Sequence, residues 1–291
     1  NEVKQDVRGI KQVVLTKKKT NEEKSSSIQN LKFQNSKKQN YIKNWNSRLF
    51  LHVDNDENPI TLSDAFIMPD YKMNQTIKRM GFFEEDTLDI VIKKFSNYDK
   101  TATMLIQGEP GIGKSSIVSW IADKYDSDHR FIILNFRDWS NKDLEDGLMV
   151  SIYNLLDCKK SDLESKILIL DGFDEIKSLD KRNDLLNDFL MDMLDMEHFK
   201  CIITSRSTYI DNFEDFQVVV KLLPFNMDKI KQFYFKIKSK EWRNLIIDYE
   251  DTKVLGIPVI LYMAIMSNID IAKNITRPGL YDCIFAQKGG I

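Results

Sequence analysis

An eight-residue run, GEPGIGKS at residues 108–115, lies between an apolar stretch and a segment with helical periodicity. It matches the pattern G-x-x-x-x-G-K-[ST], which occurs where a buried strand turns sharply into a helix. The glycines let the backbone turn tightly, so that successive N–H groups face one anion at the positive end of the helix. The run therefore constrains the chain to an α/β fold with a phosphate-binding loop. The residues expected to bind the ligand there are Gly108, Glu109, Pro110, Gly111, Ile112, Gly113, Lys114, Ser115 and Ser116.

Two residues of this loop have specific predicted roles. Lys114 is expected to reach the β- and γ-phosphates of a nucleotide, and the Ser115 hydroxyl is expected to ligate Mg²⁺. A second metal ligand is expected where the apolar run 167–170 leads directly into Asp171. A carboxylate at the carboxyl end of a parallel strand is placed to hold the metal, directly or through water.

Two further carboxylates, Asp174 and Glu175, follow closely. Either is placed to orient or deprotonate an attacking water, and Glu175 is slightly favoured as the base. Arg206 follows a third apolar run and is predicted to contact the γ-phosphate by a charge-assisted hydrogen bond. An arginine at a strand end can equally pair with Asp or Glu for structure, and this alternative stays open.

Five apolar runs alternate with segments of helical periodicity. Most of these runs lack the apolar–polar alternation of a half-solvated strand, which is typical of a parallel sheet covered on both faces. The order of elements therefore predicts a three-layer α/β domain. The five expected strands are 102–107, 131–135, 167–170, 199–204 and 218–223.

Three regions are expected along the chain. Residues 1–47 are polar and are predicted to form a linker with one helical stripe, because such a segment cannot build a core by itself. Residues 48–224 are predicted to form the α/β domain, and residues 225–291 a helical domain. The first residue is not Met and the last residues do not resemble the end of a domain, so we expect a fragment of a longer protein.

Charge and composition restrict the class of partner. The chain has 42 Lys and Arg against 44 Asp and Glu, a net charge of -2, which argues against a generally basic nucleic-acid or membrane-surface protein. No direct nucleic-acid site is evident. Three widely separated cysteines indicate packed thiols in a reducing compartment. Because no apolar stretch is long enough for a membrane span and no signal-peptide pattern occurs, a cytoplasmic protein without a membrane partner is expected.

Three motifs in this order, GEPGIGKSS, ILILDGFDE and IITSR, resemble those of the NACHT branch of the STAND nucleoside-triphosphatases, which are signalling relatives of the AAA+ ATPases. The resemblance covers roughly residues 49–285 and includes LLPF at 222–225 and GIPVIL at 256–261. It implies a P-loop NTPase with an ASCE/AAA+-like parallel sheet of strand order 5-1-4-3-2, followed by a helical domain. It also implies that the cofactors are ATP or ADP with Mg²⁺.

The same resemblance implies where the base of the nucleotide lies. Pro258 corresponds to a family proline that lies against the adenine, and Phe66, Ile67 and Pro69 occupy the place where family members line the base from the upstream side. For Pro258 a second interpretation stays open, since proline is common in the first turn of a helix.

The function implied by the resemblance is that of a molecular switch. The ADP form would be closed and monomeric, the ATP form would be open and oligomeric, and slow ATP hydrolysis would act as a timer. Family members carry an N-terminal effector and a C-terminal sensor, and neither is recognisable here. The winged-helix domain that usually follows is not recognisable either, so we expect the chain to end before it. Lys-, Asn- and Ile-rich usage suggests a prokaryotic protein, and prokaryotic members are associated with antiviral defence, a form of innate immunity.

Two alternatives remain at this point. One is a conventional working ATPase of the AAA+ or KAP type, for which turnover is the function. The other is a scaffold that binds nucleotide without hydrolysing it.

Overall fold

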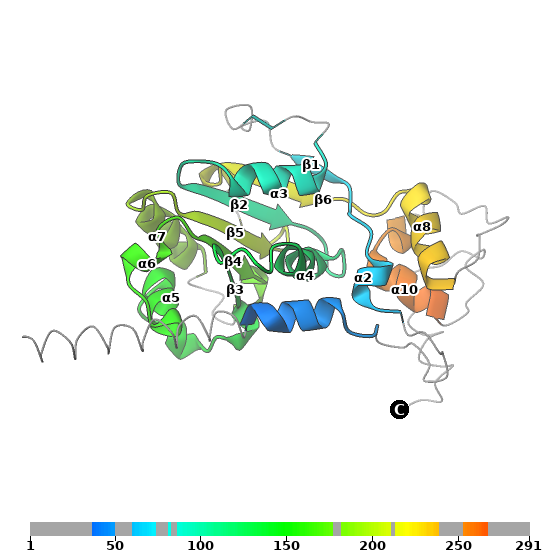
Figure 1. Ribbon diagram of the computed structural model, residues 1–291, viewed down its shortest axis with the longest axis horizontal. Helices are drawn as coiled ribbons and strands as arrows, with labels where there is room; N and C mark the ends of the chain where they lie inside the picture. Colours follow the sequence, from blue (N-terminus) through cyan, green and yellow to red (C-terminus); the bar gives the residue numbers. More distant parts are fainter. Residues whose placement is uncertain are drawn as a thin grey trace, which may run out of the picture.

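The computed structural model describes these parts of the 291-residue chain: 37–49, 60–73, 81–82, 86–176, 182–210, 213–238 and 253–266. In them a sheet is covered by helices on both faces, and a small helical cluster stands beside this sandwich (Figure 1). The helical stripe predicted near the start of the chain and the last part of the predicted helical domain lie outside the described residues.

The described residues form a six-stranded sheet in the order β1-β6-β2-β5-β4-β3. Strands β2 to β6 are parallel, and β1 pairs antiparallel with β6 at the edge. Numbered along the chain, the parallel strands have the order 5-1-4-3-2, so the predicted topology is confirmed. The strands are β1 (Tyr71–Met73), β2 (Ala102–Gln107), β3 (Phe131–Asn135), β4 (Ile167–Asp171), β5 (Lys200–Ser205) and β6 (Val218–Leu222).

The central strands read as continuous apolar runs because both of their faces are buried. On β4, Leu168 and Leu170 pack into a core on one face of the sheet, whereas Ile167 and Ile169 pack into a second core on the other. Each of these side chains is excluded from solvent. The three-layer arrangement that the sequence predicted is therefore present.

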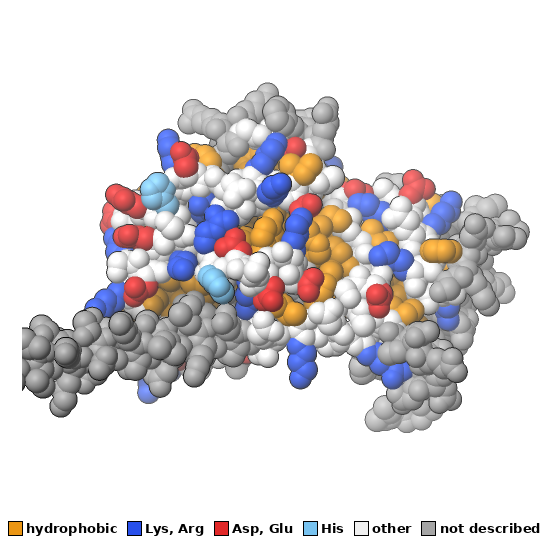
Figure 2. Space-filling view, viewed as in Figure 1, with side chains coloured by type: hydrophobic (Ala, Val, Ile, Leu, Met, Phe, Trp, Pro, Cys, Tyr) orange, Lys and Arg blue, Asp and Glu red, His pale blue; other side chains and the backbone are white. Residues whose placement is uncertain are grey.

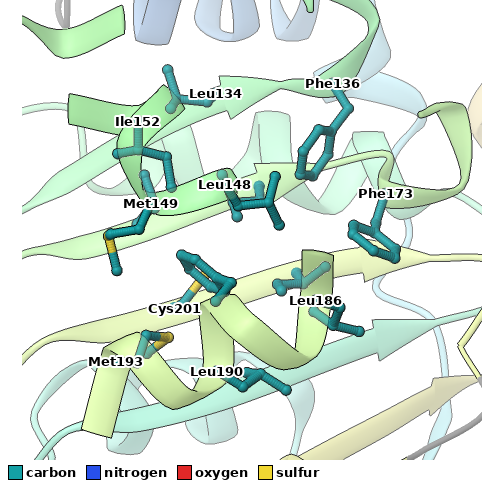
Figure 3. Packing of buried hydrophobic residues seen from close by; sticks show 14 of the residues in the cluster. Leu134, Phe136, Leu148, Met149, Ile152, Phe173, Leu186, Leu190, Met193 and Cys201 are labelled. Atoms are coloured by element: carbon teal, nitrogen blue, oxygen red, sulfur yellow. The ribbon is translucent and has the colours of Figure 1, made fainter. Parts of the chain in front are cut away.

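Helices from two parts of the chain cover each face. One face carries α3 (Leu88–Ser96) and α4 (Lys114–Lys124), and the other carries α5 (Leu148–Leu156) and α7 (Arg182–Leu194). Figure 3 shows the second face, where Leu148, Met149 and Ile152 of α5 lie near Leu186, Leu190 and Met193 of α7. Shorter elements connect these layers: α6 (Lys160–Leu163), η2 (Phe136–Asp138), η3 (Asn141–Leu144), η4 (Phe173–Glu175) and η5 (Phe213–Asp215).

The helical cluster combines segments from both ends of the described chain. Helices α8 (Met227–Lys238) and α10 (Pro258–Met266) share a core with Ala65 of α2 (Leu62–Ala65), which precedes the sheet in sequence. The cluster is therefore not built from residues after 224 alone, as the sequence suggested. The reason is that α2 is a single turn whose one fully buried side chain gives no periodic pattern.

A helix at residues 37–45 also packs on the α/β body, although the sequence analysis placed this segment in a polar linker. Tyr41 and Trp45 are buried, and Tyr41 belongs to the same core as α3 and α4. Its packing side consists of Lys38, Tyr41, Ile42 and Trp45. This stripe is short and begins with a lysine, so it did not stand out among the surrounding Lys, Asn and Gln residues.

Candidate functional site

The predicted phosphate-binding loop joins β2 to α4 at the carboxyl edge of the sheet. Two of its glycines adopt a backbone conformation that other residues rarely adopt: Gly111 and Gly113 have φ of 78° and 104°, in the left-handed region. A Cβ on Gly108 would lie 2.6 Å from the Ile112 side chain. The Gly108 N–H donates to the Ser205 carbonyl at 3.2 Å, which ties the loop to β5. The loop therefore has the strand–turn–helix context that the motif requires.

Lys114 begins α4 and folds back over the loop. Its ammonium donates to the Gly108 carbonyl at 2.7 Å and to the Glu109 carbonyl at 3.3 Å. Burial lowers the pKa of Lys114, while the nearby carboxylates of Asp174 and Asp171 act in the opposite direction. The cation thus lies among the charged groups that the sequence assigned to one site. In the first turn of the same helix Ser115 is exposed and Ser116 is half-buried.

Asp171 ends β4 and is only 2% exposed. Both of its carboxylate oxygens accept hydrogen bonds: Oδ1 from the Thr204 hydroxyl at 2.5 Å, and Oδ2 from the Tyr41 hydroxyl at 2.9 Å. The Thr204 oxygen in turn accepts from the Gly172 N–H at 2.8 Å. Neither Thr204 nor Tyr41 was singled out from the sequence. Thr204 could have been, because it is a polar residue near the end of the apolar strand that precedes Arg206.

Asp174 and Arg206 form an ion pair between the ends of β4 and β5. Arg206 Nε lies 2.7 Å from Asp174 Oδ2, and the Arg206 backbone N–H donates to Oδ1 at 3.1 Å. The Asp174 side chain is 5% exposed and that of Arg206 is 42% exposed. In this structure Arg206 therefore has the pairing role that the sequence left open, whereas its predicted contact with a γ-phosphate stays a prediction.

Glu175 is paired with a residue that the sequence analysis missed. Arg137, just after β3, donates from Nη2 to Glu175 Oε1 at 2.6 Å and from Nε to Oε2, so the contact is bidentate. The Arg137 side chain is 71% exposed and that of Glu175 23%. The hydrogen bond to Glu175 raises the pKa of Arg137, so its guanidinium remains charged. Each of the two candidate bases is thus held by an arginine.

An apolar pocket adjoins the loop. Phe66, Ile67, Pro69 and Pro258, the residues predicted to surround a base, all line it. Gly111, Ile112, Gly113 and Ser116 form the side of the pocket next to the loop. The remaining lining residues were not predicted from the sequence as contacts of the base; they are Leu49, Leu62, Ala65, Phe225, Phe233, Val259 and Tyr262. Figure 2 shows hydrophobic side chains gathered between the α/β body and the helical cluster.

The helical cluster touches the loop directly at Gly111. The Val259 N–H, in the first turn of α10, is 3.4 Å from the Gly111 carbonyl oxygen. A Cβ on Gly111 would lie 2.2 Å from the Val259 Cγ1 atom. Glycine at this position is what lets the helix approach so closely.

The oxygen atoms of Ser115 and Asp171 suit Mg²⁺, which proteins usually hold by one or two oxygen ligands together with phosphates and water. Within the described residues no group of three or more His, Cys, Asp or Glu side chains could hold a metal ion by itself. A magnesium ion at this edge would therefore depend on a phosphate ligand. None of the helices in the described segments is both long and apolar enough to span a membrane.

Comparisons with known proteins bear on the family. Residues 102–241 match the family model of the NACHT domain. No curated protein matches the chain. Among solved structures, a STAND protein with a tetratricopeptide repeat sensor from Pyrococcus horikoshii is similar at 16% identity and a TM-score of 0.41, over 69% of this chain and 32% of that one. The chain therefore spans about a third of the length of this relative.

Two further similar structures come from Thermotoga maritima. A variant of RuvB has 16% identity and a TM-score of 0.34, over 64% of this chain and 61% of that one. Domain III of the replication initiation protein DnaA has 15% identity and a TM-score of 0.37, over 67% of this chain and 86% of that one. The matched residues include the five parallel strands and the phosphate loop. They also include the motifs ILILDGFDE and IITSR, which contain β4 and β5. Residues 102–241 are thus similar to the NACHT domain, and this part of the chain has the three-layer fold of a P-loop NTPase.

Proposed function

We propose that this chain binds ATP or ADP with Mg²⁺ and acts as a signalling switch of the NACHT/STAND class, with slow ATP hydrolysis. One observation carries the proposal: the phosphate loop, the charged strand ends and an apolar pocket lie together, and α10 of the helical cluster contacts the loop at Gly111. A nucleotide at this position would contact both the α/β body and the helical cluster. Its phosphorylation state could then bias how the two parts pack.

The phosphates would lie on the backbone N–H groups of the loop, with Lys114 adding a positive charge. Ser115 and Asp171 would hold Mg²⁺, which neutralises charge on phosphate oxygens when bound. The base would enter the apolar pocket between Phe66 and Pro258, which both line it. The apolar lining and the resemblance to NACHT proteins together favour adenine.

The two ion pairs support slow hydrolysis. A general base needs an accessible carboxylate in hydrogen-bond reach of the attacking water. Here Glu175 is held by Arg137 through two hydrogen bonds, and Asp174 is held by Arg206. Hydrolysis therefore requires at least one pair to open first. This favours a switch over a working ATPase, which would need a base that is free in every cycle.

The proposed switch also implies self-association and further domains. We infer that the ATP form self-associates, and that an effector and a sensor outside this chain supply the output and the input. A cytoplasmic location and a role in prokaryotic antiviral defence follow from the family resemblance. The match of residues 102–241 to the NACHT domain is the observation that supports these roles.

The test is the identity and amount of nucleotide released when the purified protein is denatured. We expect about one ADP per chain and very slow turnover of added ATP. Lys114→Ala is expected to yield an empty protein, whereas Lys142→Ala, in η3, serves as a matched control that retains nucleotide. An empty wild-type site with steady hydrolysis would instead indicate the working ATPase. If wild type binds ATP but never hydrolyses it, and Glu175→Gln does not differ from wild type in this respect, the protein is the non-hydrolysing scaffold.

A further inference from the structure

The helix at residues 37–45 contacts two residues of the candidate site and the far end of the helix that follows the phosphate loop. Lys38, Tyr41 and Trp45 are three and four residues apart and therefore share one face of the helix. Lys38 reaches the end of α4, Tyr41 reaches Asp171, and the Trp45 ring packs edge-on against Phe66 with centroids 4.9 Å apart. This helix precedes the residues that match the NACHT domain, so its contacts connect the site to a part of the chain outside that match.

Tyr41 is the central contact. Its side chain is 7% exposed, and its hydroxyl donates to Asp171 Oδ2 at 2.9 Å. The same hydroxyl accepts from Asn135 Nδ2 at 2.9 Å, at the end of β3. A tyrosine hydroxyl has one proton to donate, and the carboxylate can only accept, so the Asp171 contact fixes the direction of the hydrogen bond.

Asp171 is consequently held from both sides. Thr204 donates to one carboxylate oxygen and Tyr41 to the other. Each oxygen keeps a further lone pair that can accept from a metal-bound water or bind the metal itself. Partners of this kind orient the atoms that bind a metal, and their removal commonly weakens metal binding. Thr204 comes from the sheet itself, whereas Tyr41 comes from a helix 130 residues away in sequence.

The helix is anchored beside this contact by its lysines. Lys38 is buried, and its ammonium donates to the backbone carbonyls of Tyr125, Asp126 and Asp128, the latter two at 2.8 and 3.3 Å. These carbonyls follow the last turn of α4, where the helix dipole favours a cation. Lys37 forms an ion pair with Asp138 in η2. Docking of this helix therefore positions Tyr41 between the phosphate-loop helix and β3.

We propose that Tyr41 is a positioning residue for Mg²⁺: its hydroxyl fixes the Asp171 carboxylate, and metal loading is thereby coupled to docking of the 37–45 helix. The inference rests on the proposed function, because it assumes that Asp171 helps to hold Mg²⁺ beside a bound nucleotide. Coupling of this kind is reciprocal. A docked helix favours metal binding, and bound metal favours the docked helix.

The first test measures binding of a fluorescent ATP analogue at increasing Mg²⁺ concentration, and again in EDTA. Tyr41→Phe keeps the ring and removes only the hydroxyl. We expect the Mg²⁺ concentration for half-maximal binding to rise by about 10-fold, with little change in EDTA. Tyr153→Phe is the matched control, since Tyr153 packs in the core on the other face of the sheet. It is expected to behave as wild type.

The second test measures hydrogen exchange, first without nucleotide and then with an ATP analogue. Hydrogen exchange in the nucleotide-free protein is expected to be faster at residues 37–45 in Tyr41→Phe, with the parallel strands unchanged. Adding Mg²⁺ and a non-hydrolysable ATP analogue should protect this helix in wild type and protect it less in the variant. Lys38→Met, which removes the anchor without touching Asp171, should raise the Mg²⁺ requirement in the same direction but by less.

The outcomes separate the two proposals. If wild type binds no nucleotide at any Mg²⁺ concentration, the proposed function itself fails. A second outcome is that wild type binds nucleotide with Mg²⁺, and that both Tyr41→Phe and Lys38→Met have the same Mg²⁺ dependence as wild type. That result would leave the proposed function standing and overturn the role of Tyr41. Equal exchange at residues 37–45 in wild type and Tyr41→Phe would likewise overturn it.

Discussion

Arg137 and Glu175 face each other as a bidentate ion pair, with Arg137 Nη2 2.6 Å from Glu175 Oε1 and Nε bonded to Oε2. The pair joins the segment after β3 to the acidic turn after β4, across the edge where the phosphate loop lies. Each carboxylate oxygen of Glu175 thus already accepts a hydrogen bond from the guanidinium, which leaves less room for a water to bind there. This pairing would hinder Glu175 from acting as the base that the sequence favours.

Removal of Arg137 is expected to accelerate ATP hydrolysis. An exposed ion pair is worth about 0.2–1 kcal/mol, so releasing Glu175 in Arg137→Ala should raise the single-turnover rate by up to about fivefold. The affinity for nucleotide should change little, because Arg137 does not line the apolar pocket. Glu175→Gln should abolish the gain in the Arg137→Ala background. A slower Arg137→Ala would instead mean that this arginine assists the reaction.

The pair between Asp174 and Arg206 predicts a stability effect in the nucleotide-free protein. Arg206→Ala leaves a carboxylate with a 5% exposed side chain without its charged partner. We expect a loss of about 1–2 kcal/mol in the free energy of unfolding, measured by urea denaturation. Asp174→Asn in the same background should restore part of it, because no buried charge remains. If Arg206 served only a bound nucleotide, its removal would not alter the stability of the nucleotide-free protein.

The parallel strands and the phosphate loop could be predicted because each depends on neighbouring residues in sequence. A strand buried on both faces needs an uninterrupted apolar run, as β4 shows, and the loop needs glycines at fixed spacing. β1 escaped prediction because three residues, of which the middle one is exposed and the other two are half-buried, are too few to form a pattern. The predicted base-pocket residues Phe66 and Pro258 do meet in one pocket. That placement came from the family resemblance, since nothing local links them.

Tyr41 and Arg137 could not be predicted in this way. Each is a single residue in a polar context, and each acquires its role by contact with a carboxylate far along the chain: Asp171 is 130 residues from Tyr41, and Glu175 is 38 residues from Arg137. A pattern of spacing cannot reveal a contact between isolated residues. Only the packing of the 37–45 helix and the turn after β3 brings them to the site.

The pKa of Lys114 predicts how nucleotide affinity depends on pH. Burial lowers the pKa of Lys114 from its usual value of 10.5, so the nucleotide-free protein loses this proton at a lower pH than an exposed lysine would. Affinity for ADP, measured by calorimetry, should therefore fall as the pH rises through the lowered pKa. Lys114→Arg, which keeps its charge, should abolish that alkaline decline. A flat profile for wild type up to pH 10.5 would contradict the prediction.

The lowered pKa of Lys114 also affects the stability of the fold, which changes with pH in the opposite direction to nucleotide affinity. Between the lowered pKa and 10.5 the unfolded chain binds more protons at Lys114 than the folded chain does. The contribution of this group to the stability of the nucleotide-free protein therefore rises with pH in that window. Urea denaturation at several alkaline pH values should show that the free energy of unfolding of wild type rises relative to that of Lys114→Arg. If the pKa of Lys114 were raised instead, this free energy would fall.

The contact between Gly111 and Val259 gives a test of how the helical cluster closes on the phosphate loop. In Gly111→Ala the new Cβ would lie 2.2 Å from Val259 Cγ1, and the residue would keep a φ of 78°. The left-handed conformation alone costs about 1–2 kcal/mol for a residue other than glycine. Displacement of α10 adds to that cost, so ADP affinity and thermal stability should both fall.

Two further variants separate strain from displacement. Gly81 has a φ of 73°, and no atom lies within 4 Å of the position of its Cβ, so Gly81→Ala measures the backbone strain alone. Val259→Ala in the Gly111→Ala background removes the clash and leaves the strain. We expect this double variant to recover ADP affinity toward wild type while its melting temperature stays low, as in Gly81→Ala. If the double variant binds ADP no better than Gly111→Ala, the approach of α10 does not control access to the site.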